Sequence, residues 1–278
     1  MSFSNNVLTI DVEDWYHVCN TGRGLAAPPR ESWRVFQNVE KILALLKTGG
    51  QRATFFMLGS VAENVPELAP MIAAAGHELA SHGFSHKLIT SITPQKFREE
   101  LKLTERILVE QTGQRPVGFR APQWSLSERT PWAFKILSEE GYLYDSSLNP
   151  LPFVGNSRNS RTAYRLEGEG TGLWEIPPMV TKSWMGNLPT GGGWGFRFFP
   201  FRMICSTIET LNRKHHSAVL YLHPRELDPA GPRLDLPSLK RFVSYGTRTD
   251  ATTRLSELFR RYRFITLKEL VDEWQHVS

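Results

Sequence analysis

The chain has 278 residues, of which 40% are hydrophobic and 22% charged, and its 8 Trp and 16 Phe supply enough apolar surface for a large core, which excludes a disordered chain. The formal net charge is +5, but Lys and Arg are scattered without long runs, so we expect an ordinary basic surface and no nucleic-acid partner. The two cysteines, Cys19 and Cys205, lie far apart, which excludes a disulfide framework and a cysteine-based zinc site and predicts buried free thiols.

The amino-terminal sequence MSFSNNVLTIDVEDW has no basic start and no apolar stretch long enough for a signal peptide. No window of the chain approaches the ~20 apolar residues of a membrane-spanning helix. We therefore expect a cytoplasmic protein with no transmembrane segment, whose contact with the inner membrane, if it has one, is peripheral.

Short apolar runs alternate with helical patterns along the first half of the chain, which predicts an α/β fold. Gly76 is typical of a helix end, and Thr93 followed by Pro94 is typical of a helix start. In chain order we predict strands at 7–10, 53–56, 77–80, 117–119 and 142–144, and helices at 33–46, 62–75, 94–111 and 131–140.

The second half of the chain is less regular. Residues 149–200 form a Gly-, Pro- and aromatic-rich stretch that predicts ordered loops with short strands, and residues 225–250 predict a long surface excursion. Between and after them we predict a strand at 218–222 and helices at 201–212, 253–262 and 267–274. We interpret residues 1–278 as a single domain.

Two histidines follow a predicted strand in the segment SHGFSH. His82 and His86 stand four positions apart, beside Gly83, which lets the backbone turn closely. Two imidazoles at this spacing can converge on one metal ion, although such pairs also occur without a metal. The pair is therefore a candidate metal site.

Polar groups also follow three other predicted strands. Asp11, Glu13 and Asp14 follow the strand at 7–10, Arg120 lies in GFRAPQWS, and His223 ends the strand in VLYLHPREL. Functional groups collect at the carboxyl ends of strands in βα barrels. We therefore expect these side chains to share one edge of the fold with the histidine pair.

The order of these motifs resembles carbohydrate esterase family four, the polysaccharide deacetylases, which share a nodulation-type deacetylase homology domain. The segment TFFMLG at residues 54–59 is similar to the second strand of that family. Several segments resemble the bacterial subgroup associated with exopolysaccharide loci: DVEDW, HELASHGFSH, FRAPQWS, YDSSLNP, WEIPP, GGGWGFRFFP and YLHPRELDP. The resemblance spans roughly residues 7–267 and implies a distorted (β/α)7-type barrel with an irregular Gly- and aromatic-rich insertion.

The resemblance also implies a role for each of the polar residues. His82, His86 and one acid would hold a divalent metal ion, Asp11 would be the general base, Arg120 would orient that base, and His223 would be the general acid. The ion would be Zn²⁺, with Co²⁺, Ni²⁺ and Mn²⁺ as alternatives, because a site of two histidines and one carboxylate suits several metals.

The sequence departs from the common family pattern at the third metal ligand. That pattern has two adjacent Asp residues as base and ligand, whereas Val12 follows Asp11 here. Strand alternation places Glu13 on the same face as Asp11, but a bend in the chain would bring Asp14 there instead. Both acids remain candidates.

A second departure concerns the pocket for the acetyl methyl group, which the family usually builds from a Trp and a Leu. No Trp follows Asp145 closely in this chain, so we consider Trp124, Leu222 and Trp194 as substrate-binding candidates. Asp145 itself is either a hydrogen-bonded structural acid or a charge partner of His223.

The function implied by the resemblance is metal-dependent hydrolysis of N-acetyl groups from N-acetylhexosamine units of a bacterial exopolysaccharide or its lipid-linked precursor. The partner would be an acetylated amino-sugar glycan, lipid-linked at the membrane surface. Two alternatives remain: an allantoinase-like hydrolase of small amides on the same fold, and a catalytically inactive glycan-binding module.

Overall fold

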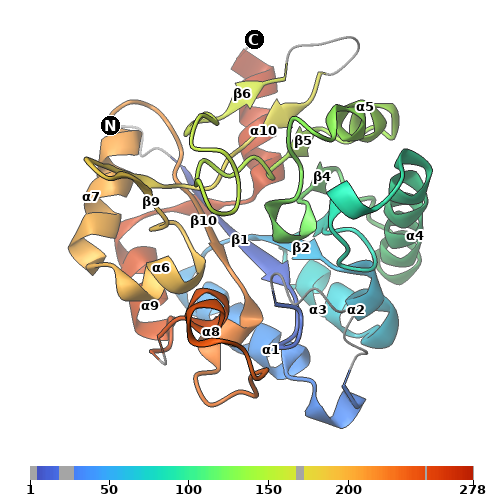
Figure 1. Cartoon of the computed structure of the whole chain (residues 1–278), viewed down its shortest axis with the longest axis horizontal. Coiled ribbons are helices and arrows are strands. Elements are labelled where there is room, and N and C mark those ends of the chain that lie inside the picture. Colours follow the sequence, from blue (N-terminus) through green and yellow to red (C-terminus); the bar gives the residue numbers. More distant parts are fainter. Residues whose placement is uncertain (1–4, 19–27, 167–171, 248, 278) are drawn as a thin grey trace.

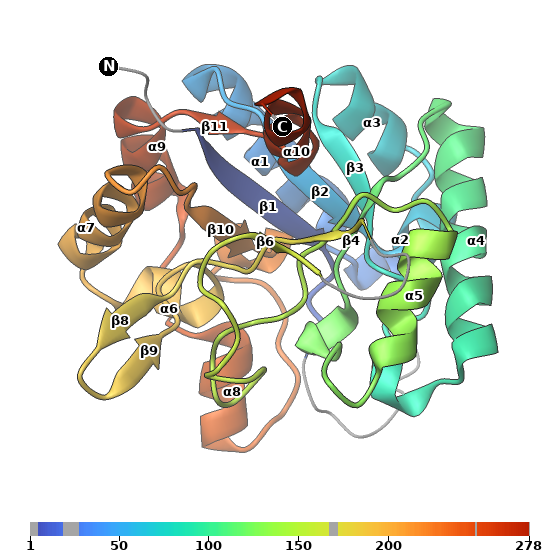
Figure 2. The same ribbon diagram turned by 90° about the horizontal axis from the view of Figure 1, so that it is seen from above.

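The protein, examined as a computed structural model, is built around one curled β-sheet with helices packed outside it (Figures 1 and 2). The structure describes residues 5–18, 28–166, 172–247 and 249–277. Its nine-stranded sheet has the order β10-β1-β2-β3-β4-β5-β7-β6, and β11 pairs with β1 beside this path. The predicted α/β class is therefore confirmed.

Most strands of the sheet are parallel, and among the described strand pairs within it only β6–β7 is antiparallel. A separate two-stranded antiparallel hairpin is formed by β8 and β9. The strands are β1 (Asn6–Val12), β2 (Thr54–Met57), β3 (Glu78–Ser81), β4 (Gly118–Phe119), β5 (Tyr144–Asp145), β6 (Tyr164–Arg165), β7 (Trp174–Glu175), β8 (Thr181–Ser183), β9 (Gly186–Leu188), β10 (Val219–Leu222) and β11 (Phe264–Ile265).

The helices surround this sheet and cover its outer face (Figure 1). They are α1 (Val35–Gly49), α2 (Gly59–Asn64), α3 (Leu68–Ala74), α4 (Pro94–Thr112), α5 (Pro131–Glu139), α6 (Gly193–Phe198), α7 (Phe201–Asn212), α8 (Ser238–Tyr245), α9 (Thr252–Arg261) and α10 (Leu267–Val277). In the described part of the chain, four short 3₁₀ helices add to them: η1 (Arg30–Ser32), η2 (Ile89–Ser91), η3 (Pro122–Trp124) and η4 (Pro224–Leu227). None of the described helices is both long and apolar enough to cross a membrane.

Strand β1 lies at the centre of the fold, and all seven of its residues are buried. It pairs with β2 on one side and with β10, from the far end of the chain, on the other. Val7, Leu8, Ile10 and Val12 lose nearly all contact with water, and each buried side chain of this kind contributes about 1.5–3 kcal/mol to folding. The residues that follow β1 are thus held on a rigid element.

Three sequence predictions need correction. The helix predicted at 62–75 is two helices, because Pro66 lies between α2 and α3, and proline has no N–H to continue a helix. The loop-rich stretch at 149–200 contains the helix α6, and the excursion at 225–250 contains α8. Cys205 is a buried free thiol as predicted, whereas Cys19 lies outside the described residues.

Candidate active site

The first part of the site lies where β1 ends. Asp11 is the second-last residue of β1, and Glu13 follows the strand directly. Because strand side chains alternate between the two faces of a sheet, these residues, two positions apart, lie on the same face. Both residues are buried, with 3% and 4% of their surface exposed. Carboxylates this deeply buried need charged or hydrogen-bonding partners, and both have them.

The histidine pair lies on the loop that follows β3. The backbone turns sharply here: Gly83 has φ +73° and His86 has φ +57°, a left-handed conformation that costs a non-glycine residue about 1–3 kcal/mol. Glu100 of α4 holds the loop, because its carboxylate accepts hydrogen bonds from the backbone of Phe84 and from the backbone and hydroxyl of Ser85. The loop is therefore fixed in a conformation that carries strain at His86.

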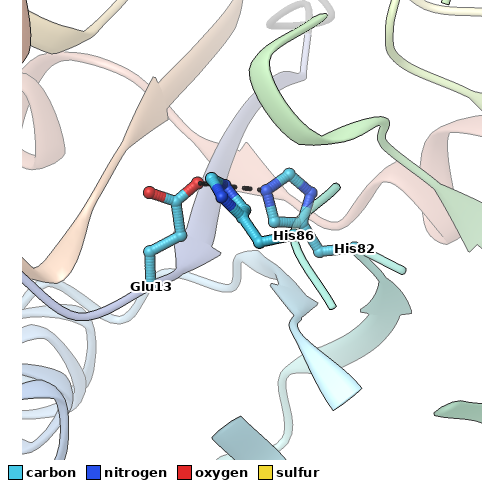
Figure 3. Close-up of side chains that lie close together, drawn as sticks. All are labelled: Glu13, His82 and His86. Atoms are coloured by element: carbon cyan, nitrogen blue, oxygen red, sulfur yellow. Dashed lines mark hydrogen bonds and ion pairs between the residues drawn. The ribbon is translucent and has the colours of Figure 1, made fainter. Parts of the chain in front are cut away.

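Glu13, His82 and His86 converge on one point (Figure 3). The Nε2 atoms of His82 and His86 lie 3.1 Å and 2.9 Å from the same carboxylate oxygen, Oε1 of Glu13. One ligand atom from each residue lies within 4.8 Å of the other two. Two imidazoles and one carboxylate with this spacing form a set that suits Zn²⁺ and other divalent transition metals.

The hydrogen bonding of His82 also fits a metal ligand. Its Nδ1 lies 2.8 Å from the backbone carbonyl oxygen of Arg120, and only a protonated Nδ1 can donate to a carbonyl. In the neutral ring, Nε2 is then the atom with a free lone pair, and it points at the convergence point. Metal-binding histidines are usually fixed in this way by the nitrogen that does not bind the metal.

Asp14 lies apart from the two histidines. Its carboxylate accepts hydrogen bonds from the backbone N–H groups of Trp15, Arg34 and Val35, so it satisfies donors at the start of α1. Of the two acids that the sequence left open, Glu13 is therefore the one that the structure brings to the histidine pair.

Arg120 follows β4 and is fully buried beside Asp11. Its Nη1 donates to Oδ1 of Asp11 at 2.7 Å and to the hydroxyl of Thr9 at 2.7 Å. Its Nε and Nη2 donate to the carbonyl and the hydroxyl of Ser146, and its guanidinium lies 4.2 Å from the centre of the Phe56 ring. With its guanidinium fixed at so many points, Arg120 orients Asp11 and leaves the other carboxylate oxygen, Oδ2, facing the site.

His223 follows β10 and closes the site from the side of β1 opposite the histidine pair. Its Nε2 lies 3.9 Å from Oδ2 of Asp11 and 3.9 Å from Oε2 of Glu13. Its Nδ1 lies 2.9 Å from Oε1 of the buried Glu226, which also accepts from the His223 backbone N–H. Glu226 thereby fixes the ring with Nε2 directed at the acids.

Two further residues contact the site and were not singled out from the sequence. Arg225 donates through Nη1 to Oε2 of Glu13 at 2.9 Å. The ring of His17 lies 5.4 Å from that of His86, and burial, followed by the His86 charge, lowers the pKa of His17 to about 3. A neutral His17 can accept the hydrogen bond that Asp14 N–H donates to its Nδ1. The position of Arg225, two residues after His223, was the available sequence signal.

The electrostatics of the site favour the charged form of Glu13. Burial alone would raise its pKa, but the charges of His86 and His223 and the hydrogen bonds from His82 and His86 hold it well below the usual range. For His82, burial lowers the pKa, but the hydrogen bond to Glu13 and the charge of Asp11 outweigh burial and raise it. A carboxylate that stays ionised is the form that binds a cation.

The three substrate-binding candidates lie in different places. Trp124 is at the site: its ring contacts Tyr221 at 4.9 Å between centroids and lies 4.9 Å from the guanidinium of Arg120. Leu222 is 1% exposed and belongs to the main hydrophobic core. Trp194 packs in an aromatic cluster with Phe198, Phe199 and Phe242.

Of the two roles predicted for Asp145, its contacts fit that of a hydrogen-bonded structural acid. Its carboxylate accepts a 2.6 Å hydrogen bond from the Ser147 hydroxyl and lies beside the buried Glu175. The charge partner of His223 is Glu226 instead. Ser147 in turn accepts from the Ala121 backbone N–H, so Asp145 supports the segment that carries Arg120.

Two family models match this chain. Residues 33–142 match the model described as Polysaccharide deacetylase, and residues 146–272 match a domain of unknown function, DUF3473. Residues 33–142 therefore form a polysaccharide deacetylase domain. Both matched segments contribute strands to the same sheet.

Curated relatives of this chain include two bacterial enzymes. The chain is 32% identical over 155 residues to a peptidoglycan deacetylase of Helicobacter pylori, covering 50% of this chain and 52% of the relative. It is 35% identical over 159 residues to a peptidoglycan-N-acetylglucosamine deacetylase of Bacillus cereus, covering 50% of this chain and 57% of the relative. The matches thus span about half the length of these relatives.

Solved structures confirm the predicted barrel-type α/β fold. A Mycobacterium smegmatis protein described as a polysaccharide deacetylase superposes with a TM-score of 0.61 at 24% identity, covering 86% of this chain and 77% of that one. The Puue allantoinase superposes with a TM-score of 0.64 at 18% identity, covering 98% and 90%. At these identities the likeness concerns the fold.

Proposed function

We propose that this chain hydrolyses the N-acetyl groups of N-acetylhexosamine residues in a bacterial glycan with the help of a divalent metal ion. The observation that carries the proposal is the meeting of Glu13, His82 and His86 at one point, with Asp11 and His223 beside it. The match of residues 33–142 to the polysaccharide deacetylase model supports the same reaction.

The chemistry divides among the chain's own residues and the ion. A bound divalent ion, held by Glu13, His82 and His86, would supply Lewis-acid activation of the amide carbonyl and of the attacking water. Asp11 accepts a proton from that water through Oδ2, because Arg120 occupies Oδ1. His223 gives a proton to the departing amine from Nε2, which Glu226 directs into the site.

The identities of the glycan and of the metal ion are also part of the proposal. We take the glycan to be an exopolysaccharide or its lipid-linked precursor, and the ion to be Zn²⁺. The name of the Bacillus cereus relative supports a glycan that contains N-acetylglucosamine. The cytoplasmic location stays a prediction of the sequence.

An acetate-release assay tests the proposal. The purified chain, loaded with Zn²⁺, should release acetate from N-acetylglucosamine oligosaccharides. Acetate release should stop after the ion is removed by chelation and should resume when Zn²⁺ is restored. Asp11→Asn should lose this activity while still binding the oligosaccharide. Release of products from allantoin but not from acetylated sugars would favour the small-amide alternative, and glycan binding without any acetate release would favour the inactive module.

A further inference from the structure

We propose that the loop after β5 and the tip of the β8–β9 hairpin form a docking surface for an anionic lipid membrane. This surface consists of Phe153 and Arg158 on the loop and of Lys182, Trp184 and Met185 on the hairpin. The proposal goes beyond the hydrolysis proposed above, because it concerns where the chain works rather than what it does to the substrate.

The apolar side chains of the docking surface are unusually exposed. Phe153 is 94% exposed, Trp184 92% and Met185 69%. A single exposed apolar side chain is ordinary in a soluble domain, but large apolar groups gathered on loop tips mark contact sites. Trp, with an apolar ring and a polar N–H, is enriched at the boundary between lipid and water.

The hairpin is hydrogen-bonded to the first part of the loop, and the turn of the hairpin is preformed. The side chain of Asn187 on the hairpin donates to the backbone carbonyl of Pro150 at 2.8 Å, three residues before Phe153. The hydroxyl of Ser183 accepts from the Met185 N–H and donates to the Gly186 carbonyl, which fixes the turn. Figure 2 shows the hairpin and the loop projecting from the same side of the molecule.

The described exposed charges on the loop and the hairpin are basic. Of the described charged residues between positions 149 and 191, the exposed ones are all basic: Arg158, Arg161, Arg165 and Lys182. The described acid in this stretch, Glu175, is fully buried. Basic side chains beside exposed apolar ones complement the headgroups and the interface of an anionic membrane.

The docking surface is connected to the edge of the sheet that also carries the candidate active site. The loop leaves the carboxyl end of β5, and Ser146 at its start accepts the hydrogen bond from Arg120 Nε. A membrane bound at this surface would therefore meet the edge of the fold that carries Asp11 and His223. That arrangement presents a glycan attached to a lipid to the site.

Vesicle flotation of the full chain tests the proposal. Wild type should bind vesicles of phosphatidylglycerol mixed with phosphatidylcholine, and less well at high salt. A triple variant, Phe153→Ser with Trp184→Ser and Met185→Ser, should bind at least about tenfold more weakly. Val109→Ser on α4, where Val109 is 40% exposed, is the matched control and should bind like wild type.

The charge contribution has its own test and control. Lys182→Glu with Arg158→Glu should weaken binding to vesicles that contain phosphatidylglycerol, whereas Lys135→Glu on α5, where the Lys135 side chain is 67% exposed, should not. Thermal unfolding of each variant shows whether it is folded; all the replaced side chains lie at the surface.

Two results would overturn the proposal: a wild-type chain that stays unbound with anionic vesicles, or a triple variant that binds them as well as wild type does. A triple variant that keeps vesicle binding but loses affinity for N-acetylglucosamine oligosaccharides would show a glycan contact instead. Flotation does not require turnover, so vesicle binding can be interpreted even if the proposed deacetylation fails.

Discussion

Arg225 and Glu13 form an ion pair through the Glu13 carboxylate oxygen that does not contact His82 and His86. Nη1 of Arg225 lies 2.9 Å from Oε2, while Oε1 lies against the Nε2 atoms of His82 and His86. The Arg225 side chain is only 10% exposed, so solvent screens the pair weakly. Arg225 therefore orients Glu13 so that a single oxygen faces the convergence point.

Replacing Arg225 should weaken metal binding without touching a ligand. In Arg225→Met the carboxylate loses its fixed orientation, and we expect Zn²⁺ affinity to fall about 10- to 100-fold, the usual effect of losing a group that positions a ligand. Competition against a chromophoric zinc chelator measures the affinity directly. Arg225→Lys should recover part of the loss.

An exposed arginine provides the control for this experiment. Arg213→Met, at the end of α7, should leave Zn²⁺ affinity unchanged. Equal affinities in wild type and Arg225→Met would show that the ion pair has no part in shaping the metal centre.

The buried Glu226 should matter for turnover through His223. Glu226→Gln keeps an oxygen near Nδ1 of His223 but removes the charge, and it leaves Arg197, whose Nε lies 3.3 Å from Oε2, without its carboxylate. We expect kcat for acetate release to fall by about tenfold or more, with KM and Zn²⁺ content unchanged. His223→Asn should lose more, about 10²–10⁴-fold in kcat. A Glu226→Gln variant with wild-type kcat would remove the proposed role.

The buried carboxyl group of Glu175 should lower the free energy of unfolding at neutral pH. Burial raises its pKa well above the usual range, and the charge and hydrogen bond of Asp145 raise it further. The folded chain then holds a proton that the unfolded chain has released, so stability falls as pH rises from the ordinary carboxyl pKa through the raised one. Glu175→Gln, which keeps an acceptor for the Leu148 N–H, should therefore be more stable than wild type, increasingly so as the pH rises above the ordinary carboxyl pKa of about 4.

Thermal unfolding across this pH range measures the effect. Glu63→Gln, at an exposed position on α2, is the control and should follow the wild-type pH profile. If Glu175→Gln also runs parallel to wild type at every pH, the buried carboxyl is not the source of the pH dependence.

Much of the fold could be predicted from the sequence where apolar periodicity was strong. The helix predicted at 201–212 coincides with α7, and the strand at 218–222 differs from β10 by one residue. The helix α8 was missed although Leu239, Phe242 and Val243 follow helical spacing, because it is only eight residues long and lies in a stretch otherwise rich in Pro, Gly and charged residues.

The site could be predicted from strand ends, but the choice among its acids could not. Asp11 lies near the end of β1, Arg120 and His223 each follow a strand, and parallel pairing brings strand ends to one edge. Whether Glu13 or Asp14 faces the histidines depends on how the chain bends after Val12, and Asp14 is drawn away by the N–H groups that begin α1. Those donors lie twenty residues further along the chain, beyond the reach of any local pattern.

The metal content of two neighbouring variants tests the central claim most directly. Elemental analysis of Zn²⁺-loaded, dialysed protein should find about one ion per chain in wild type and in Asp14→Asn, because Asp14 caps α1. It should find far less in Glu13→Gln, which lacks the carboxylate that both histidines approach. Retention of the ion in Glu13→Gln together with its loss in a folded Asp14→Asn would contradict the proposed metal centre.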